Sequence, residues 1–126
     1  MSHPAMLITD AGLGPAGPTI RWVNPEFEKM TGYDASELIG RKPSMLQGEK
    51  TSKAALAVLR RAIRAGVTHR TVLVNYRKNG EPYLCDIEIR PIFDDVGKVL
   101  CFLAIESETH RKRGRPPGRL KLSSGP

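Results

Sequence analysis

The sequence has few of the residues that build metal sites and disulfide bonds. It contains two cysteines, Cys85 and Cys101, both in stretches typical of strands, and three scattered histidines, His3, His69 and His110. No two of these residues follow each other at the spacing of a metal-binding motif. We therefore expect no metal site, and we interpret both cysteines as buried, reduced thiols.

The sequence also lacks a long apolar run. The longest near-continuous one, Val99 to Ile105, is much shorter than the roughly 20 residues that a helix needs to cross a bilayer. The N-terminus does not show the basic, apolar and small-residue order of a secretion signal. We therefore expect no membrane association, and a location in the cytoplasm at the nucleoid or in the nucleus.

Acidic residues are missing from the end of the chain. Residues 110–126 contain six arginines and lysines and no acid, whereas residues 1–109 contain 14 basic and 13 acidic residues. The tail thus supplies most of the net charge of +7, which indicates an acidic polymer as partner. We divide the chain into a flexible N-terminus (1–5), a folded domain (6–109) and a basic tail (110–126). We expect the tail to be disordered because proline, glycine and serine dominate it.

The first half of the domain contains short predicted elements. Two strands, over 6–11 and 19–24, precede a short helix over 25–31 that is capped by Asn24 and has proline at its first position. Ser36 is expected to cap a further helical turn before the glycine-flanked turn 40–48.

The second half contains the longest predicted elements. An apolar stripe predicts a helix from Ser52 to Gly66. Three strands follow, over 68–78, 82–93 and 98–107. The whole order predicts an α+β fold, in which a five-stranded antiparallel sheet is covered on one face by short helices and one longer helix.

Side-chain alternation assigns residues to the two faces of this sheet. Asn75 is expected to face the helices, and on the last strand Glu106 shares one face with its alternate neighbours. The other face is rich in apolar residues such as Leu103 and Ile105. We interpret this outer face as a candidate homodimer interface, and its coverage by the terminal segments is the alternative.

Several segments of residues 6–109 together carry a family resemblance. They are Ile8-Thr9-Asp10, Trp22-Val23-Asn24-Pro25-Glu26-Phe27, Met30-Thr31-Gly32-Tyr33, Leu38-Ile39-Gly40-Arg41, Leu46-Gln47-Gly48 and Asn75-Tyr76-Arg77-Lys78-Asn79-Gly80. Together they resemble a PAS domain of the light-oxygen-voltage (LOV) branch. This resemblance implies the PAS fold, and it implies a pocket that holds flavin mononucleotide (FMN) next to a reactive cysteine in the turn 40–48.

The reactive cysteine of that branch is absent here. Pro43 stands at its position, and proline has neither a nucleophile nor a backbone N–H group, so the thiol adduct cannot form. Cys85 matches the position of an asparagine at the rim of the flavin ring, so it is no substitute. Any light response would have to proceed through reduction of the ring.

The other polar positions of the implied pocket are half retained. Gln47, Arg60 and Asn75 match the family pattern, whereas Ser44 replaces an arginine that holds the phosphate, and Glu106 replaces a glutamine. Each lost hydrogen-bond partner would weaken flavin binding by about 1 to 3 kcal/mol. The sequence therefore leaves the cofactor open, and FMN is the candidate.

Glu106 has two interpretations. A carboxyl group in an apolar pocket tends to stay protonated, and it would then donate a hydrogen bond to a ligand carbonyl as an amide does. The alternative is that Glu106 bonds Asn75, Arg60 or water and only fills the site.

The tail resembles an AT-hook, whose core Arg-Gly-Arg-Pro is matched by residues 113–116. Two arginines on a slim extended backbone fit the narrow, negative minor groove of A·T-rich DNA. The predicted DNA-binding residues are Arg111, Lys112, Arg113, Gly114, Arg115, Pro116 and Arg119. A nuclear localisation signal, an RNA-binding or solubilising tail, and the basic end of a longer protein are the alternatives.

These observations predict a sensory or regulatory protein rather than an enzyme, because the sequence has no nucleophile with a base, no metal cluster and no phosphate-binding loop. We expect a PAS domain of LOV type that acts in transcription or signalling through A·T-rich DNA. A flavin-binding photosensor or redox sensor without adduct chemistry, and a PAS adapter that binds other proteins, are the alternatives.

Overall fold

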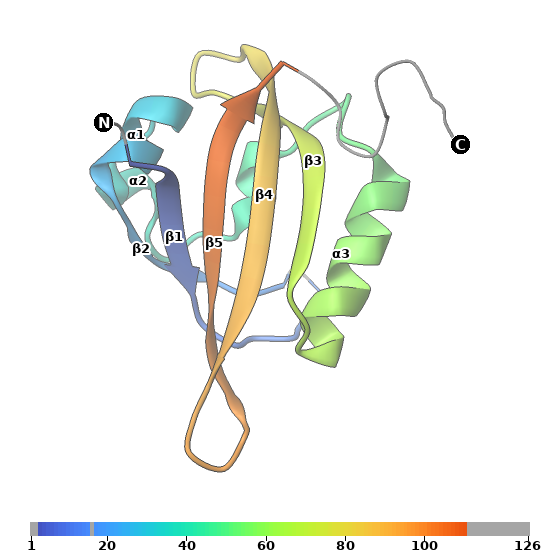
Figure 1. Cartoon of the computed structure of the whole chain (residues 1–126). Helices are drawn as coiled ribbons and strands as arrows, with labels where there is room; N and C mark the ends of the chain where they lie inside the picture. Colours follow the sequence, from blue (N-terminus) through green and yellow to red (C-terminus); the bar gives the residue numbers. More distant parts are fainter. Residues whose placement is uncertain (1–2, 16, 111–126) are drawn as a thin grey trace.

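The computed structural model describes residues 3–15 and 17–110, and these residues form one five-stranded antiparallel sheet with helices on one face (Figure 1). The strand order is β2-β1-β5-β4-β3. The strands are β1 (Ala5–Thr9), β2 (Ile20–Val23), β3 (His69–Tyr76), β4 (Pro82–Phe93) and β5 (Val99–Thr109). The predicted α+β architecture with a five-stranded antiparallel sheet is confirmed.

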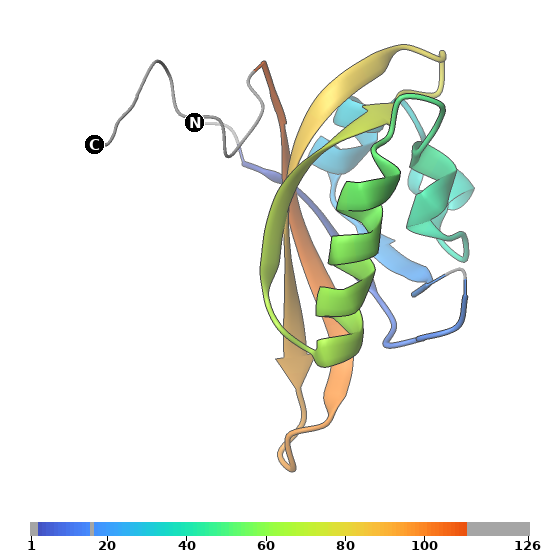
Figure 2. The ribbon, with the colours of Figure 1, turned by 90° about the vertical axis from the view of Figure 1, so that its right-hand side faces the viewer.

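The helical elements connect β2 to β3 and cover the inner face of the sheet (Figure 2). They are α1 (Pro25–Thr31), α2 (Ala35–Leu38), the 3-10 helix η1 (Pro43–Leu46) and α3 (Lys53–Ala65). In the part of the chain that is described, none of these helices has the length and apolar character of a membrane span.

Asn24 joins the first helix to the first strand. Its Oδ1 atom accepts hydrogen bonds from the backbone N–H of Phe27, at 3.0 Å, and of Met6, at 2.8 Å, and its amide donates to the carbonyl of Pro4. The predicted cap of α1 is therefore also a cross-link. This link explains why β1 begins at Ala5, a residue that we had placed in the flexible N-terminus.

The start of α2 differs from the prediction. Asp34, not Ser36, occupies the N-cap position, and its backbone N–H donates to the carboxylate of Glu37 at 2.9 Å. Ser36 lies inside the helix. Glu37, three residues after Asp34, bonds back to the backbone of Asp34, and this pairing favours the aspartate over the serine as the cap.

The long helix α3 follows its sequence pattern closely. Ser52 caps it by accepting a hydrogen bond from the N–H of Ala55 at 3.1 Å, and Gly66 ends it with a φ of 67°. Its apolar stripe packs onto the inner face of the sheet, where Leu56, Leu59 and Ala62 are buried.

The alternation on β3, β4 and β5 was also predicted correctly. Asn75 and Glu106 are buried on the inner face, with 4% and 5% of their surfaces exposed. Leu103 and Ile105 on the outer face are only partly buried. Both cysteines are free thiols, but only Cys85 is buried, because Cys101 points to the outer face.

Candidate functional site

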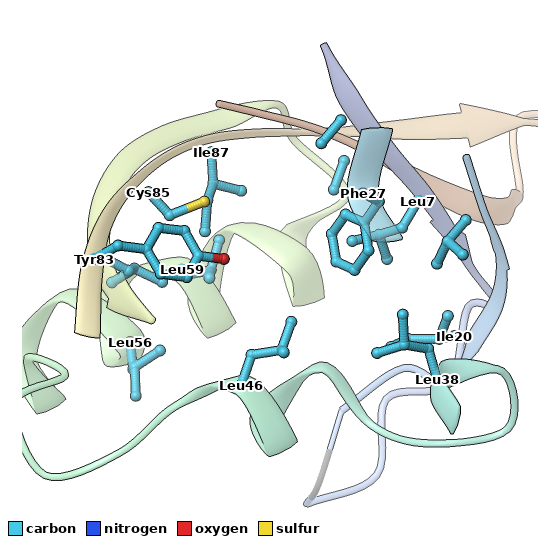
Figure 3. Packing of buried hydrophobic residues seen from close by; sticks show 14 residues of the cluster. Leu7, Ile20, Phe27, Leu38, Leu46, Leu56, Leu59, Tyr83, Cys85 and Ile87 are labelled. Atoms are coloured by element: carbon cyan, nitrogen blue, oxygen red, sulfur yellow. The ribbon is translucent and has the colours of Figure 1, made fainter. Parts of the chain in front are cut away.

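A cavity of about 120 Å³ lies between the inner face of the sheet, α3 and the η1 turn. This volume is several times the roughly 10–15 Å³ that one water molecule needs. Its walls are mostly apolar, and Figure 3 shows Leu46, Leu56 and Leu59 on the helical side, opposite the sheet. The polar side chains that line it are Thr9, Ser44, Gln47, Arg60, Asn75 and Glu106.

The turn that forms one wall is anchored to the edge of the sheet. The backbone of Ile20 on β2 accepts a hydrogen bond from Gly40 and donates one to Arg41, both at 2.8 Å. The ammonium of Lys42 donates to the carbonyl of Gly17 and to the hydroxyl of Thr19. These bonds hold the next residue, Pro43, against the cavity.

The other end of this wall is fixed on β3 by a short set of hydrogen bonds. The Thr51 hydroxyl donates to the carbonyl of Val74 at 2.6 Å and accepts from the N–H of Gly48. The phenol oxygen of Tyr76 accepts from the N–H of Lys50 at 2.8 Å. A Cβ atom on Gly48 would lie 2.4 Å from the Tyr76 ring, so only glycine allows this approach next to Gln47.

Three buried ionisable groups lie on the sheet side of the cavity, and of these only Glu106 lines it. The Cys85 thiol donates to Oε1 of Glu106 with an Sγ–Oε1 distance of 3.2 Å. The Tyr83 hydroxyl is buried without a hydrogen-bond partner among the residues that the structure describes. Figure 3 shows Tyr83 and Cys85 on β4.

Burial changes the protonation of these three groups. Loss of solvent raises the pKa of the Glu106 carboxyl to about 7, and the Cys85 hydrogen bond opposes this shift. Burial also raises the pKa of Cys85 and of Tyr83. Near neutral pH the thiol and the phenol are therefore uncharged, and the carboxyl is close to its midpoint.

The opposite end of the cavity has unpaired positive charge. Arg60 lines the cavity, and Arg60 and Arg64 both border a smaller adjoining pocket beside the loop that contains Gly14. Neither guanidinium has an ion pair or hydrogen bond within the described ranges. The site therefore has an acid on its sheet wall, one arginine without an ion pair in its lining, Arg60, and a second, Arg64, in the adjoining pocket.

The structure brings five of the six predicted pocket residues to one cavity, and these are Pro43, Gln47, Arg60, Asn75 and Glu106. Cys85 does not line the cavity and lies behind Glu106. Sequence reasoning missed Tyr83 and Arg64. The spacing of Arg64, one helical turn after Arg60, is a signal that could have found it.

The remaining predicted site residues cannot be placed. The AT-hook residues Arg111 to Arg119 lie outside the described residues. Within residues 3–15 and 17–110, no three side chains of histidine, cysteine, aspartate or glutamate gather as they would around a metal ion.

Comparison with known proteins identifies the family. The family model described as "PAS domain" matches residues 4–109. A blue-light photoreceptor of Listeria innocua is 40% identical over 89 residues, which are 71% of this chain and 35% of that protein. The chain spans about a third or less of the length of the curated relatives it matches, from 12% to 35%.

Two solved structures have the same fold. The LOV domain of the Erythrobacter litoralis EL346 blue-light activated histidine kinase has a TM-score of 0.79 and 31% identity, and the match covers 88% of this chain and 100% of that one. A structure described as "Flavin Analogue Sheds Light on Light-Oxygen-Voltage Domain Mechanism" has a TM-score of 0.79 and 29% identity, with 84% and 77% covered. The chain belongs to the PAS domain family, and within that family it is a sensory domain of LOV type.

Proposed function

We propose that this domain is a flavin-binding sensor of blue light or redox state that works without a bond between a thiol and the flavin. The observation that carries the proposal is the cavity itself. Gln47, Asn75 and Glu106 still line it together, although Pro43 has replaced the reactive cysteine. Polar side chains that face a ring-sized apolar cavity without a nucleophile fit a cofactor that is held but not covalently bonded.

The residues of the cavity fit a flavin. Its apolar walls suit a flat aromatic ring, and Gln47, Asn75 and Glu106 would meet the polar edge of that ring. Arg60 and Arg64, which have no counter-ion among the described residues, would bind the phosphate in place of the arginine that Ser44 replaces. When bound, the flavin supplies absorption of blue light and one-electron chemistry, while these residues hold and orient it.

Absorbance of the purified chain and a fluorescence titration with FMN test this function. We expect one FMN per chain and a yellow protein. The Ala104→Leu variant, which fills part of the cavity from its buried wall, should bind FMN less tightly while keeping its circular dichroism spectrum. A chain that stays colourless and does not bind FMN at micromolar concentration would show that the cavity serves another purpose.

The two arginines can be tested separately from the ring. Arg64→Ala should weaken FMN binding by about tenfold, which is the size of one partly exposed charge-assisted contact, and should leave riboflavin binding unchanged. Arg61→Ala is the matched control, because Arg61 is on the same helix but borders neither pocket. An equal loss for riboflavin would assign Arg64 a structural role.

We also propose how the sensor acts on its target: the basic tail binds A·T-rich DNA. Its support is the sequence Arg-Gly-Arg-Pro at 113–116 and the concentration of positive charge after residue 109. This proposal does not depend on the ligand in the cavity.

A further inference from the structure

We propose that Glu106, held by the Cys85 thiol behind it, forms a proton-donating subsite in the sheet wall of the cavity. In this subsite an uncharged Glu106 donates a hydrogen bond to the accepting edge of a flat heterocyclic ligand. The inference rests on the proposed function, which supplies that class of ligand. It adds that the ligand binds together with a proton, so that occupancy depends on pH in the neutral range.

The position of the Cys85 thiol selects which oxygen of Glu106 can meet the ligand. The thiol donates to Oε1, so this oxygen acts as the acceptor. The other oxygen, Oε2, has no hydrogen bond with any residue in the described ranges, and Glu106 lines the cavity. A neutral carboxyl therefore keeps its proton on Oε2, where only a ligand or solvent in the cavity can accept it.

Among the groups around Glu106, only the Cys85 thiol favours its charged form. Arg77, the residue after β3, already forms ion pairs with Glu81 and Glu108, and its guanidinium lies 4.3 Å from the centre of the Tyr83 ring. The titratable groups around Glu106 are Tyr83 and Cys85 on β4, Glu108 on β5, Arg77 after β3, His3 before β1, Glu26 and Lys29 on α1, and Arg60 on α3. In the part of the chain that is described, none of them forms an ion pair with Glu106.

Burial favours the neutral acid. Loss of solvent raises the pKa of Glu106 to about 7, and the uncharged phenol of Tyr83, which does not line the cavity, adds no positive charge beside it.

Riboflavin is the probe for the test, because it lacks a phosphate that itself titrates near pH 6. Its dissociation constant is measured by flavin fluorescence at pH 6, 7 and 8 with the full chain. If only the protonated site binds, the wild-type dissociation constant rises about tenfold from pH 6 to pH 8. The isosteric Glu106→Gln variant should bind with a constant affinity, since its amide donates at every pH.

Two further variants separate Glu106 from its neighbours. His3→Asn should keep the wild-type pH dependence, because His3 does not line the cavity. Cys85→Ala keeps the acid but removes the hydrogen bond that lowers its pKa, so the midpoint should move to higher pH. Infrared spectra of the complex at pH 6 should contain a protonated carboxyl band that Glu106→Gln lacks.

The outcomes distinguish this inference from the proposed function. If riboflavin binds to the wild type with the same affinity at pH 6 and pH 8, or if Glu106→Gln retains the pH dependence, the subsite proposal is overturned and flavin binding stands. If only Glu106→Gln binds riboflavin, Glu106 is charged throughout and the proposal also fails. If neither protein binds riboflavin or FMN at any pH, both proposals fail together.

Discussion

Glu106 makes the stability of the domain depend on pH even without a ligand. Below about pH 4.5 the carboxyl is protonated in the folded and in the unfolded chain. Between pH 4.5 and about 7 the unfolded chain releases this proton while the folded chain keeps it, so stability falls as pH rises. At about 1.4 kcal/mol for each pKa unit, the contribution lost by pH 8 is roughly 3 kcal/mol.

Urea unfolding at pH 5 and pH 8 measures this effect. We expect the free energy of unfolding of the wild type to fall more between these values than that of Glu106→Gln, which cannot titrate. The hydrogen bond from the N–H of Thr19 lowers the pKa of Asp10. Asp10 therefore adds stability that is lost as the pH falls, and this loss occurs only in the acid range. Equal changes in the two proteins would show that Glu106 is not protonated in the folded state.

The sequence predicted the role of individual residues correctly where a single local rule decides that role. Asn24, Ser52 and Gly66 were placed correctly because caps follow local chemistry. The partner of Glu106 was not foreseen, since its pairing with Cys85 depends on the register between β4 and β5. The orphan hydroxyl of Tyr83 follows from packing in three dimensions, and no local pattern reports it.

Among the elements, the η1 wall depends on close contact between Gly48 and the Tyr76 ring. Gly48→Ala places a methyl group 2.4 Å from this ring, so the ring or the turn must move. We expect a loss of stability of about 1 to 3 kcal/mol, as for other overpacked sites, and weaker flavin binding through displacement of Gln47. Chemical unfolding and the flavin titration measure the two effects.

Gly14→Ala is the matched control, because nothing lies within 4 Å of the added atom. The loss should also shrink when Gly48→Ala is combined with Tyr76→Ala, since the colliding ring is then absent. A loss of the same size in that background would mean that the strain comes from the backbone of the turn.

The strands and the α-helices were predicted from the sequence with errors at their ends, whereas the 3-10 helix η1 was predicted only as a turn. Hydrophobic periodicity predicted α3 and the three long strands, because the helix and the sheet each bury one apolar face against the other. Ser36 was chosen wrongly as a cap because it competes with Asp34, and only the bond to Glu37 decides between them. The joining of the η1 wall to β3 was not predictable, since Thr51 and Val74 are far apart in the chain.

At the scale of the whole molecule, the outer face of the sheet remains our prediction for a homodimer interface. No described helix covers this face in Figure 2, and Trp22, Leu103 and Ile105 on it are exposed or only partly buried. Leu103→Glu should convert a dimer into a monomer in analytical ultracentrifugation while the domain stays folded. Val58→Glu, an exposed change on α3, should leave the mass unchanged, and a monomeric wild type would contradict the prediction.

The tail gives the second prediction at this scale. Removal of residues 111–126 should abolish binding to an A·T-rich duplex in fluorescence anisotropy, because both hook arginines are lost. The change of log affinity with log salt should be about −0.9 for each phosphate that the tail neutralises. A G·C-rich duplex is the control for sequence preference. Unchanged affinity of the truncated chain would remove the DNA-binding proposal.

β5 connects the wall of the cavity to the end of the folded domain through one continuous stretch of backbone. Glu106 reaches the cavity from this strand, and the strand ends three residues later at Thr109, about 10 Å farther along the backbone. A gain or loss of the hydrogen bonds of one carboxyl therefore acts on the same stretch of peptide that leads out of the sheet. Such a signal could leave the domain along the main chain without a relay of rearranging side chains.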